Sequence, residues 1–228
     1  MNQKKRKCSA KLPNTSIVTM YSDDEMKAVE EYIHKYFGRV ENVFHETKST
    51  GIHVDVCVIP PSEENHCYTL ATMGMGARKM NVPKELVEYR LERAELAISL
   101  PFDWKLDKES LNDMRWYWPI KLLLSTARMP IRDKTWLGCG HTVRNDKGAA
   151  YANNTKLSGC ILIDPPTFGG DRVIGYLPGG DPVNFYQIIP LYEKELDYDI
   201  RYGFDALMTR LSNAVSYVVD PSRPSALA

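Results

Sequence analysis

The chain has 228 residues, of which 43% are hydrophobic and 25% charged, and its 29 basic side chains balance 29 acidic ones. These values are typical of a soluble globular protein, and the neutral balance gives no overall field that would hold nucleic acid or an anionic membrane. No apolar run approaches the roughly 20 residues that a membrane-spanning helix needs. We therefore expect neither a nucleic-acid partner nor a membrane partner.

The N-terminus, residues 1–21, is predicted to be a polar, disordered extension. It carries a basic run at positions 4–7. No apolar segment follows that run, so it does not have the pattern of a secretory signal. Charged chain ends of this kind are usually solvated.

The cysteines indicate a reducing compartment. They are odd in number and scattered, and none forms a C-x-x-C pair: Cys8, Cys57, Cys67, Cys139 and Cys160. This spacing argues against a disulfide framework and against a four-cysteine zinc site. We expect a cytoplasmic protein.

The first predicted helix begins after Ser22. Ser22 and Glu25 have the spacing of a capping box, in which the hydroxyl and the carboxylate satisfy free amides at the helix start. Apolar residues then recur at helical spacing until Gly38 ends the helix.

Strand-like runs follow at about 43–48, 52–59, 67–73 and 88–99, separated by glycine and proline residues. The second run alternates, so one side carries Ile52, Val54, Val56 and Val58 and the other side carries His53, Asp55 and Cys57. Such a strand is expected to bury one face in the core. The other face would be left for polar recognition or chemistry.

The remaining elements are a helix, further strands and two C-terminal helices. Pro119 suits the first position of a helix that Pro130 would end. Strands are expected at 136–144, 157–164 and 183–189, and helices near 191–201 and from Phe204 onwards. The grouping predicts an α+β fold with a mixed, largely antiparallel sheet packed against helices. One domain is expected over residues 22–219, followed by a frayed tail at 220–228.

Register arguments bring three titratable side chains together. If residues 49–51 form the turn, His45 lies opposite Asp55 and next to His53 on one face, while Phe44 joins the apolar face. Alternation along the strand would turn Glu46 away from this cluster.

Two functions are open to the cluster of His45, His53 and Asp55. Imidazole and carboxylate are ligands for zinc, manganese or iron, so a metal-assisted hydrolase or small-ligand enzyme is one alternative, with Glu46 or Glu95 as the base. The other alternative is a polar network in which Asp55 orients a histidine, because buried polar groups normally pair. We favour the network and expect no cofactor.

Other motifs give weaker signals. The G-x-G at Gly74 and Gly76 lacks the third glycine of a phosphate-binding loop and is typical of a bulge or strand-ending turn. Cys139 and His141 would lie too far apart on a strand for direct activation of the thiol. A partly exposed Trp116 would suit an interface.

Taken in order, the motifs resemble those of the suppressor-of-fused family, in its N-terminal domain and in single-domain bacterial members. The matching segments span residues 25–212, and they are Phe44-His45-Glu46, Ile52-His53-Val54-Asp55-Val56, Ile59-Pro60-Pro61, Thr69-Leu70-Ala71-Thr72-Met73-Gly74-Met75, Arg93-Ala94-Glu95-Leu96, Leu100-Pro101-Phe102-Asp103-Trp104, Trp116-Tyr117-Trp118-Pro119, Phe185-Tyr186-Gln187-Ile188-Ile189-Pro190-Leu191 and Glu193-x-Glu195-Leu196.

The resemblance implies a single α+β domain that binds protein partners without enzymatic activity. Animal relatives hold zinc-finger transcription factors of the Gli type in the cytoplasm, with the help of a second domain that has no counterpart in this sequence. Bacterial relatives include proteins that look like toxin-neutralising immunity proteins. We therefore expect a protein partner, with a toxin as one candidate. The expected binding surface includes His45, His53, Asp55, Met73, Met75 and Trp116.

Overall fold

The structure is a computed structural model that describes residues 18–166, 171–212 and 215–227. In these residues, eight strands form one sheet in the order β1-β2-β3-β4-β8-β6-β5, with β7 paired to β8 beside this path. The strands are β1 (Asn42–Phe44), β2 (Asp55–Ile59), β3 (Cys67–Met73), β4 (Ala94–Pro101), β5 (Thr142–Arg144), β6 (Leu157–Ile163), β7 (Val173–Tyr176) and β8 (Pro182–Tyr192). Only the β4–β8 pair is parallel among them, so the predicted α+β class with a mixed, largely antiparallel sheet is confirmed.

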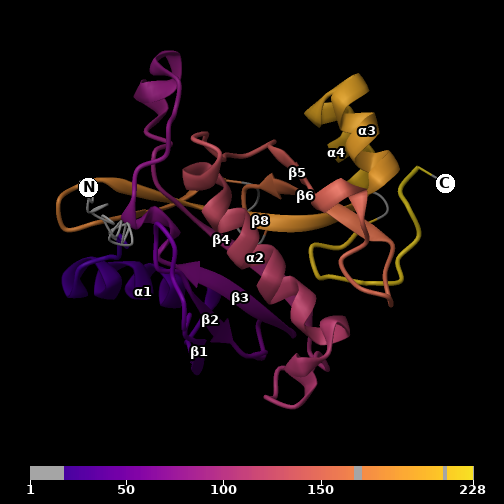
Figure 1. Ribbon diagram of the computed structural model, residues 1–228, viewed down its shortest axis with the longest axis horizontal. Coiled ribbons are helices and arrows are strands. Elements are labelled where there is room, and N and C mark those ends of the chain that lie inside the picture. Colours follow the sequence, from indigo (N-terminus) through magenta and orange to yellow (C-terminus); the bar gives the residue numbers. More distant parts are fainter. Residues whose placement is uncertain (1–17, 167–170, 213–214, 228) are drawn as a thin grey trace, which may run out of the picture.

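Helices cover both faces of this sheet (Figure 1). The α-helices are α1 (Asp23–Phe37), α2 (Met114–Arg132), α3 (Glu193–Tyr202) and α4 (Phe204–Ser212), and short 3₁₀ turns are η1 (Met75–Ala77), η2 (Lys84–Tyr89), η3 (Ser110–Asn112) and η4 (Asp146–Gly148). α2 crosses one face, whereas α1 and the α3–α4 pair pack against the opposite face. No helix of the described ranges is long and apolar enough to span a membrane.

The alternation predicted for β2 is present, but both of its faces are covered. Ile52, Val54, Val56 and Val58 join the core beneath α2, as expected. Cys57 is also fully buried, because α1 closes the other face of the sheet. The expectation that this face is left for chemistry is therefore wrong along the strand, and it holds only where the chain enters β2.

Helix ends follow the sequence signals at α1 but not at α2. Ser22 and Glu25 form the predicted capping box. At α2, by contrast, Asp113 caps the start, and Pro119 and Pro130 both lie inside the helix. Helix-internal prolines lack the N–H that would bond to the preceding turn. Here both rings are buried, so packing against the sheet outweighs those missing hydrogen bonds.

Four of the predicted strands are shorter than expected: 43–48 pairs only as Asn42–Phe44, 52–59 only as Asp55–Ile59, and two others lose residues at their start. The run 88–99 begins with a 3₁₀ turn that Arg90 ends in a left-handed conformation, and pairing starts only at Ala94. The run 136–144 pairs only from Thr142. In both places, the residues before the strand make turn or loop contacts instead.

A buried carboxylate organises the end of β3. Glu95 on β4 is fully buried and accepts five hydrogen bonds. The donors are Tyr21 OH at 2.9 Å, Thr72 Oγ1 at 2.5 Å, and the N–H groups of Gly74 at 3.0 Å, Met75 at 3.3 Å and Gly76 at 3.0 Å. Burial raises the pKa of Glu95 above its ordinary value, although these hydrogen bonds act in the opposite direction. The G-x-G segment is thus a strand-ending turn, and it wraps a carboxylate of the protein itself.

The last residues of the predicted N-terminal extension are ordered parts of the fold. Thr19 exchanges backbone hydrogen bonds with Gly51 and His53, each of 2.9 Å, and Tyr21 is buried against Glu95. The prediction of a disordered segment is wrong for residues 18–21, because Tyr21 supplies a hydrogen bond that the buried carboxylate uses. The rest of that prediction, residues 1–17, lies outside the described residues.

The C-terminal tail is also anchored rather than frayed. Arg223 is buried and forms a two-pronged ion pair with Glu195 of α3, with N–O distances of 2.9 Å and 2.6 Å. Burial alone would raise the pKa of Glu195. Arg223 and the N–H groups of Tyr192 and Ala226 outweigh this effect, so the pKa lies below its ordinary value. The tail prediction is wrong over the described residues 220–227.

Replacing Glu95 tests the buried hydrogen-bond network. In Glu95→Gln, an NH₂ group would face N–H and O–H donors in a fully buried site. We expect the free energy of unfolding to fall by about 2–3 kcal/mol, the magnitude typical of lost hydrogen bonds to a charged group. Urea unfolding measures the change, with the exposed Glu85→Gln as the control. Equal stability of the two variants would contradict the structural role of Glu95.

Replacing Arg223 tests the anchored tail. Arg223→Met leaves the Glu195 carboxylate buried without its cation, and we expect a loss of about 3–5 kcal/mol at pH 7. Because the folded pKa of Glu195 is lowered, the stabilisation is complete above the unfolded value of about 4.3 and is lost as the pH falls through the folded value.

The difference between wild type and Arg223→Met should therefore shrink on acidification, as measured by urea unfolding from pH 7 to pH 3. Arg210→Met, at an exposed position of α4, is the matched control and should cost less than about 0.5 kcal/mol. A small or pH-independent difference for Arg223→Met would show that the tail does not depend on this ion pair.

Candidate functional site

Three titratable side chains meet where β1 ends and β2 begins. β1 pairs with β2 so that Phe44 lies opposite Val56, which is the predicted register, and one further step places His45 opposite Asp55. His45 Nδ1 lies 2.9 Å from Asp55 Oδ2, and His53 Nε2 lies 3.0 Å from Asp55 Oδ1. Asp55 is nearly buried, whereas the His45 side chain is 74% exposed. The predicted convergence of these three residues is present.

Glu46 belongs to the same cluster, contrary to the sequence argument. Its N–H donates to Asp55 Oδ1 at 2.9 Å, and its carboxylate accepts from Ser49 Oγ at 2.8 Å and pairs with Arg128 of α2. The prediction is wrong because the strand ends at Phe44. Beyond that residue the backbone turns, and the alternation of a strand no longer decides where Glu46 points.

The cluster has the properties of a satisfied polar network. Asp55 accepts from two imidazoles and a backbone amide, and the second ring nitrogen of His53 lies 2.7 Å from Ser49 Oγ. Asp55 thereby orients both histidines, and the ion pair of Glu46 with Arg128 ties residues 46–55 to α2. Few lone pairs of the cluster are left for an added ligand.

The arrangement does not support metal-assisted hydrolysis. Among the described residues, no group of three or more His, Cys, Asp or Glu side chains is placed to hold a metal ion. Both ring nitrogens of His53 contact protein groups. Of the two candidate bases, Glu46 is paired with Arg128 and Glu95 is sealed in the core. The His45–His53–Asp55 set lacks the geometry that the enzyme alternative requires.

Cys139 and His141 do not form an activated pair. Burial and the nearby carboxylate of Asp164 raise the pKa of Cys139, whereas a nucleophilic thiol needs a lowered pKa. The His141 ring packs edge-on against Trp136 with centroids 4.2 Å apart, and burial lowers the pKa of His141. The sequence argument against catalysis by this pair agrees with the geometry.

Of the predicted binding residues outside the cluster, Met73 and Met75 are buried and Trp116 is partly exposed. Met73 and Met75 are 9% and 2% exposed and lie in the core, so neither can reach a partner as proposed from the sequence. The turn that binds Glu95 folds both methionines inward. Trp116 is half-buried, with its ring 5.3 Å from that of Trp104 and 5.4 Å from the Lys105 ammonium. It remains accessible on the first turn of α2.

An apolar groove lies beside the cluster, between residues 44–48 and the N-terminal half of α2. Its volume is about 330 Å³, and it is lined by Phe44, His45, Glu46, Thr47, Lys48, Val54, Leu111, Tyr117, Ile120 and Leu124. Apolar side chains form its floor, and the polar residues 45–48 form one rim. We name it the α2–β1 groove. Sequence reasoning missed it because the groove arises only when α2 is placed against β1.

Comparisons with known proteins identify the family and the fold. The model of the family described as Suppressor of fused protein (SUFU) matches residues 50–224. An uncharacterised protein of Ureaplasma parvum is 26% identical over 208 residues, which cover 90% of this chain and 96% of that protein.

Solved structures share the fold at low identity. The suppressor of fused homologue of Neisseria gonorrhoeae aligns with a TM-score of 0.61 at 17% identity, over 90% of this chain and 98% of the other. A chain of the Sufu–Fu complex aligns with a TM-score of 0.59 at 16% identity, over 90% and 93%. Drosophila Suppressor of Fused aligns at 0.56 and 14% identity, over 96% of this chain and 54% of that chain.

Replacing Asp55 tests the polar network. Asp55→Asn keeps the shape but replaces one acceptor oxygen with a donor, so contacts with His45, His53 or the Glu46 amide are lost. We expect a loss of about 1–3 kcal/mol in the free energy of unfolding. Faster hydrogen exchange of the Glu46 amide should accompany it. His45→Ala is the control, since its exposed ring should contribute less than about 0.5 kcal/mol. Unchanged exchange at Glu46 would contradict the network.

Proposed function

This chain belongs to the suppressor of fused family, and we propose that it is a non-enzymatic domain that binds another polypeptide through the α2–β1 groove. The observation that carries the proposal is an accessible apolar groove rimmed by polar side chains, next to a titratable cluster whose hydrogen bonds are already made. Such a surface can hold a partner, and the Asp55, Glu46 and His53 side chains beside it are already hydrogen-bonded within the protein.

The composition of the groove fits a protein interface. Interfaces place an apolar and aromatic centre inside a polar rim, and tyrosine is enriched among the residues that contribute most to binding. Tyr117 and Leu124 project from α2 into the groove, and Lys48 and His45 stand at its rim. The ion pair between Glu46 and Arg128 holds the rim against the helix, which limits the ordering that binding would require.

The groove would be one anchoring point within a larger contact area. A stable protein interface covers about 800 Å² on each partner. Trp116, on the same turn of α2 as Tyr117, extends the accessible surface beyond the groove. A chain related in fold has been crystallised as the Sufu–Fu complex, which supports a role in binding proteins for this family. That partner is not carried over to this chain.

A photocrosslinker placed at the rim tests the proposal. Lys48 is exposed, so a benzoylphenylalanine at this position should not disturb the fold. We expect it to capture a discrete polypeptide in the native cell. The same group at Lys27, exposed on α1 and remote from the groove, is the matched control and should capture none.

Replacement of a groove residue then measures its contribution. Tyr117→Ala should weaken the captured partner's affinity by at least about tenfold, because truncation of a buried interface aromatic typically costs more than 1 kcal/mol. Circular dichroism verifies that the variant is folded. Equal capture from positions 48 and 27 would place the interface elsewhere, and no capture from either would contradict the binding function.

The identity of the captured polypeptide tests the narrower proposal of an immunity protein. If the partner is a toxin, its expression should stop growth and co-expression of this chain should restore it. Rescue by wild type but not by Tyr117→Ala would connect the activity to the groove. A captured partner that does not inhibit growth would retain the binding function and remove the immunity role.

A further inference from the structure

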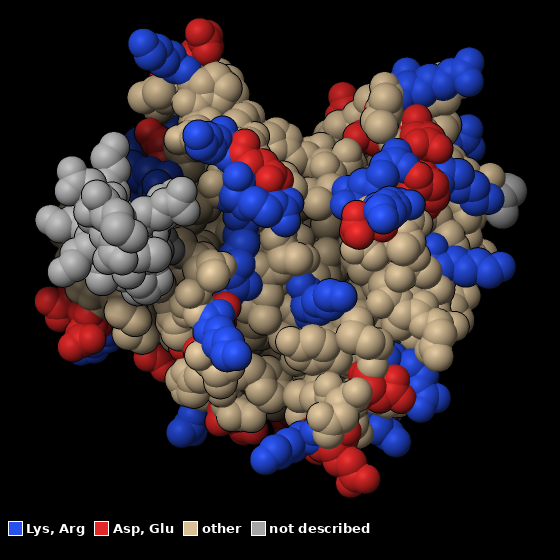
Figure 2. Space-filling view, viewed as in Figure 1, with Lys and Arg blue, Asp and Glu red and all other residues tan. Residues whose placement is uncertain are grey.

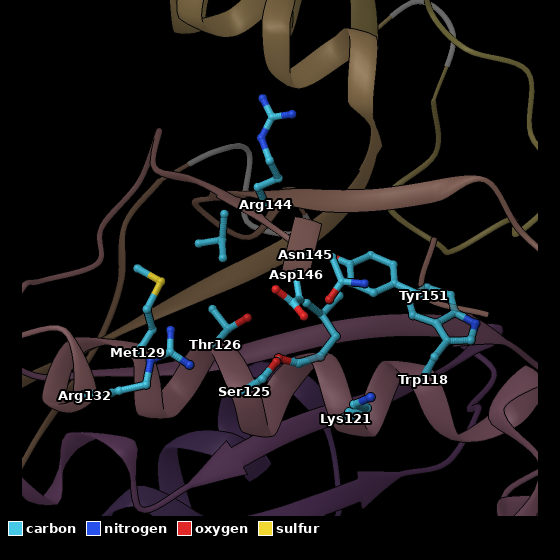
Figure 3. Close-up of a pocket in the computed structure, with 12 residues that line it drawn as sticks. Trp118, Lys121, Ser125, Thr126, Met129, Arg132, Arg144, Asn145, Asp146 and Tyr151 are labelled. Carbon is cyan, nitrogen blue, oxygen red and sulfur yellow. The ribbon is translucent and has the colours of Figure 1, made fainter. Parts of the chain in front are cut away.

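A surface pocket lies at the base of η2, where that segment meets β7 and the start of β8. Its volume is about 230 Å³, and residues of all three elements line it. Among the described residues, it shares no lining residue with the α2–β1 groove or with the cavity between α2 and η4 that Figure 3 shows. We name it the η2–β7 pocket.

The segment that carries η2 projects from the sheet (purple, at the top of Figure 1), and Figure 2 shows it standing clear of the neighbouring surface. No side chain of η2 is buried. Val87, Tyr89 and, on β7, Tyr176 are each about half exposed, and both tyrosines line the pocket. Because a segment that buries so little apolar surface gains little from the hydrophobic effect, polar contacts have to hold it in place.

A buried amide supplies those polar contacts. Asn184 of β8 is buried, and its Nδ2 donates to the carbonyl oxygens of Arg90 and Arg93, each at 3.1 Å. Its Oδ1 accepts from Arg172 Nη2 at 2.6 Å, and the same Nη2 donates to the carbonyl oxygen of Tyr89 at 3.2 Å. Asn184 therefore fixes both the backbone at the end of η2 and the position of the Arg172 side chain.

Two exposed guanidinium groups line the pocket and have donors left over. Arg90 Nη2 donates to the carbonyl oxygen of Gly180 at 2.8 Å, and Arg172 uses only its Nη2. A guanidinium group has five N–H donors. Among the described residues, neither arginine has a carboxylate within ion-pair distance. Arginine is the side chain best suited to bind a carboxylate or phosphate through two N–H groups.

Charge and size narrow the choice of ligand. Glu88 also lines the pocket, so the two arginines and this glutamate leave one net positive charge. One net charge suits a carboxylate better than a doubly charged phosphate. The volume of the pocket lies below the roughly 300 Å³ at which small-molecule sites begin, so it fits one side chain of a larger partner.

The carboxylate next to the pocket does not offset this charge. Asp181 precedes Pro182 of the pocket, and its Oδ2 lies 3.0 Å from both Lys79 Nζ and Arg93 Nε. The hydrogen bonds from these two cations hold the pKa of Asp181 below its ordinary value. Asp181 is thus already matched by two positive charges of its own.

We propose that the η2–β7 pocket binds an acidic segment of a partner polypeptide. One aspartate or glutamate side chain of the partner accepts hydrogen bonds from Arg90 and Arg172, and an adjacent apolar or aromatic side chain packs on Tyr89 and Tyr176. Tyrosine and arginine are enriched among the residues that contribute most to protein interfaces. Because Asn184 already orders this surface, binding requires little further ordering.

NMR titration of the whole chain with three hexapeptides tests the proposal. The peptides are acetylated and amidated, and they are Ser-Phe-Glu-Glu-Phe-Ser and the same sequence with two glutamines or two lysines at the centre. We expect the glutamate peptide to bind with a dissociation constant of about 1 mM or lower, about fivefold or more tightly than the glutamine peptide. It should shift the amide signals of Tyr89, Arg90 and Tyr176. Added salt should weaken its binding, and the lysine peptide should show no saturable binding.

Two variants of the same segment separate the pocket from the general field of the protein. Arg90→Met should weaken binding of the glutamate peptide by about fivefold or more, whereas Lys84→Met, at the exposed start of η2, should leave it unchanged. The contact with Asn184 uses the backbone of Arg90, so the variant keeps it, and the melting temperature should change little. Tyr176→Ala should weaken the glutamate and glutamine peptides by the same factor, because the ring contacts their shared apolar part.

Several outcomes would overturn the proposal. They are equal binding of the glutamate and glutamine peptides, saturable binding of the lysine peptide, no saturable binding of any peptide, and equal losses for Arg90→Met and Lys84→Met. Inorganic phosphate, titrated in the same way, should bind more weakly than the glutamate peptide. Tighter binding of phosphate would assign the pocket to a free anion and would also overturn the proposal. None of these results depends on the α2–β1 groove, so they leave the function proposed for that groove to its own test.

Discussion

The buried carboxylate of Glu95 is the interaction on which the arrangement of the N-terminal half depends. Five donors surround it, from β3, from the turn after β3 and from the N-terminal segment. The turn can approach closely only because Gly74 lacks a side chain, since a Cβ there would lie 2.1 Å from the carbonyl oxygen of His53. Gly74 also adopts a φ of +130°, which glycine tolerates best. The position of His53 is therefore tied through Gly74 to the core of the sheet.

This chain of contacts explains why the titratable cluster is held in a fixed position. Thr19 bonds to the backbone of Gly51 and His53, and Arg128 holds Glu46 against α2, so the segment is fixed from two sides. α2 also lines the α2–β1 groove on one side and a second cavity, towards β5, on another.

Sequence patterns predicted the features that depend on local periodicity. The α1 capping box, the apolar side of β2 and the register that brings His45 to Asp55 all follow from side-chain spacing within one or two neighbouring elements. The predictions are wrong where segments distant in the sequence determine the position of a side chain. Glu46 is placed by α2, and Arg223 is placed by a carboxylate 28 residues away. Met73 and Met75 are turned inward by Glu95, and no periodicity in the sequence contains that information.

The family relationship predicts the fold of this chain better than it predicts the partner. At 14–17% identity the solved relatives still share the fold, because a twisted sheet with helices on both faces can be built from many sets of apolar residues of suitable size. A binding groove tolerates fewer substitutions than the core, since its partner is selected by a few side chains at fixed positions. The partner of a relative is thus a property of that relative's surface. For this chain, the side chains that would select a protein partner are Tyr117, Leu124 and Lys48 of the α2–β1 groove.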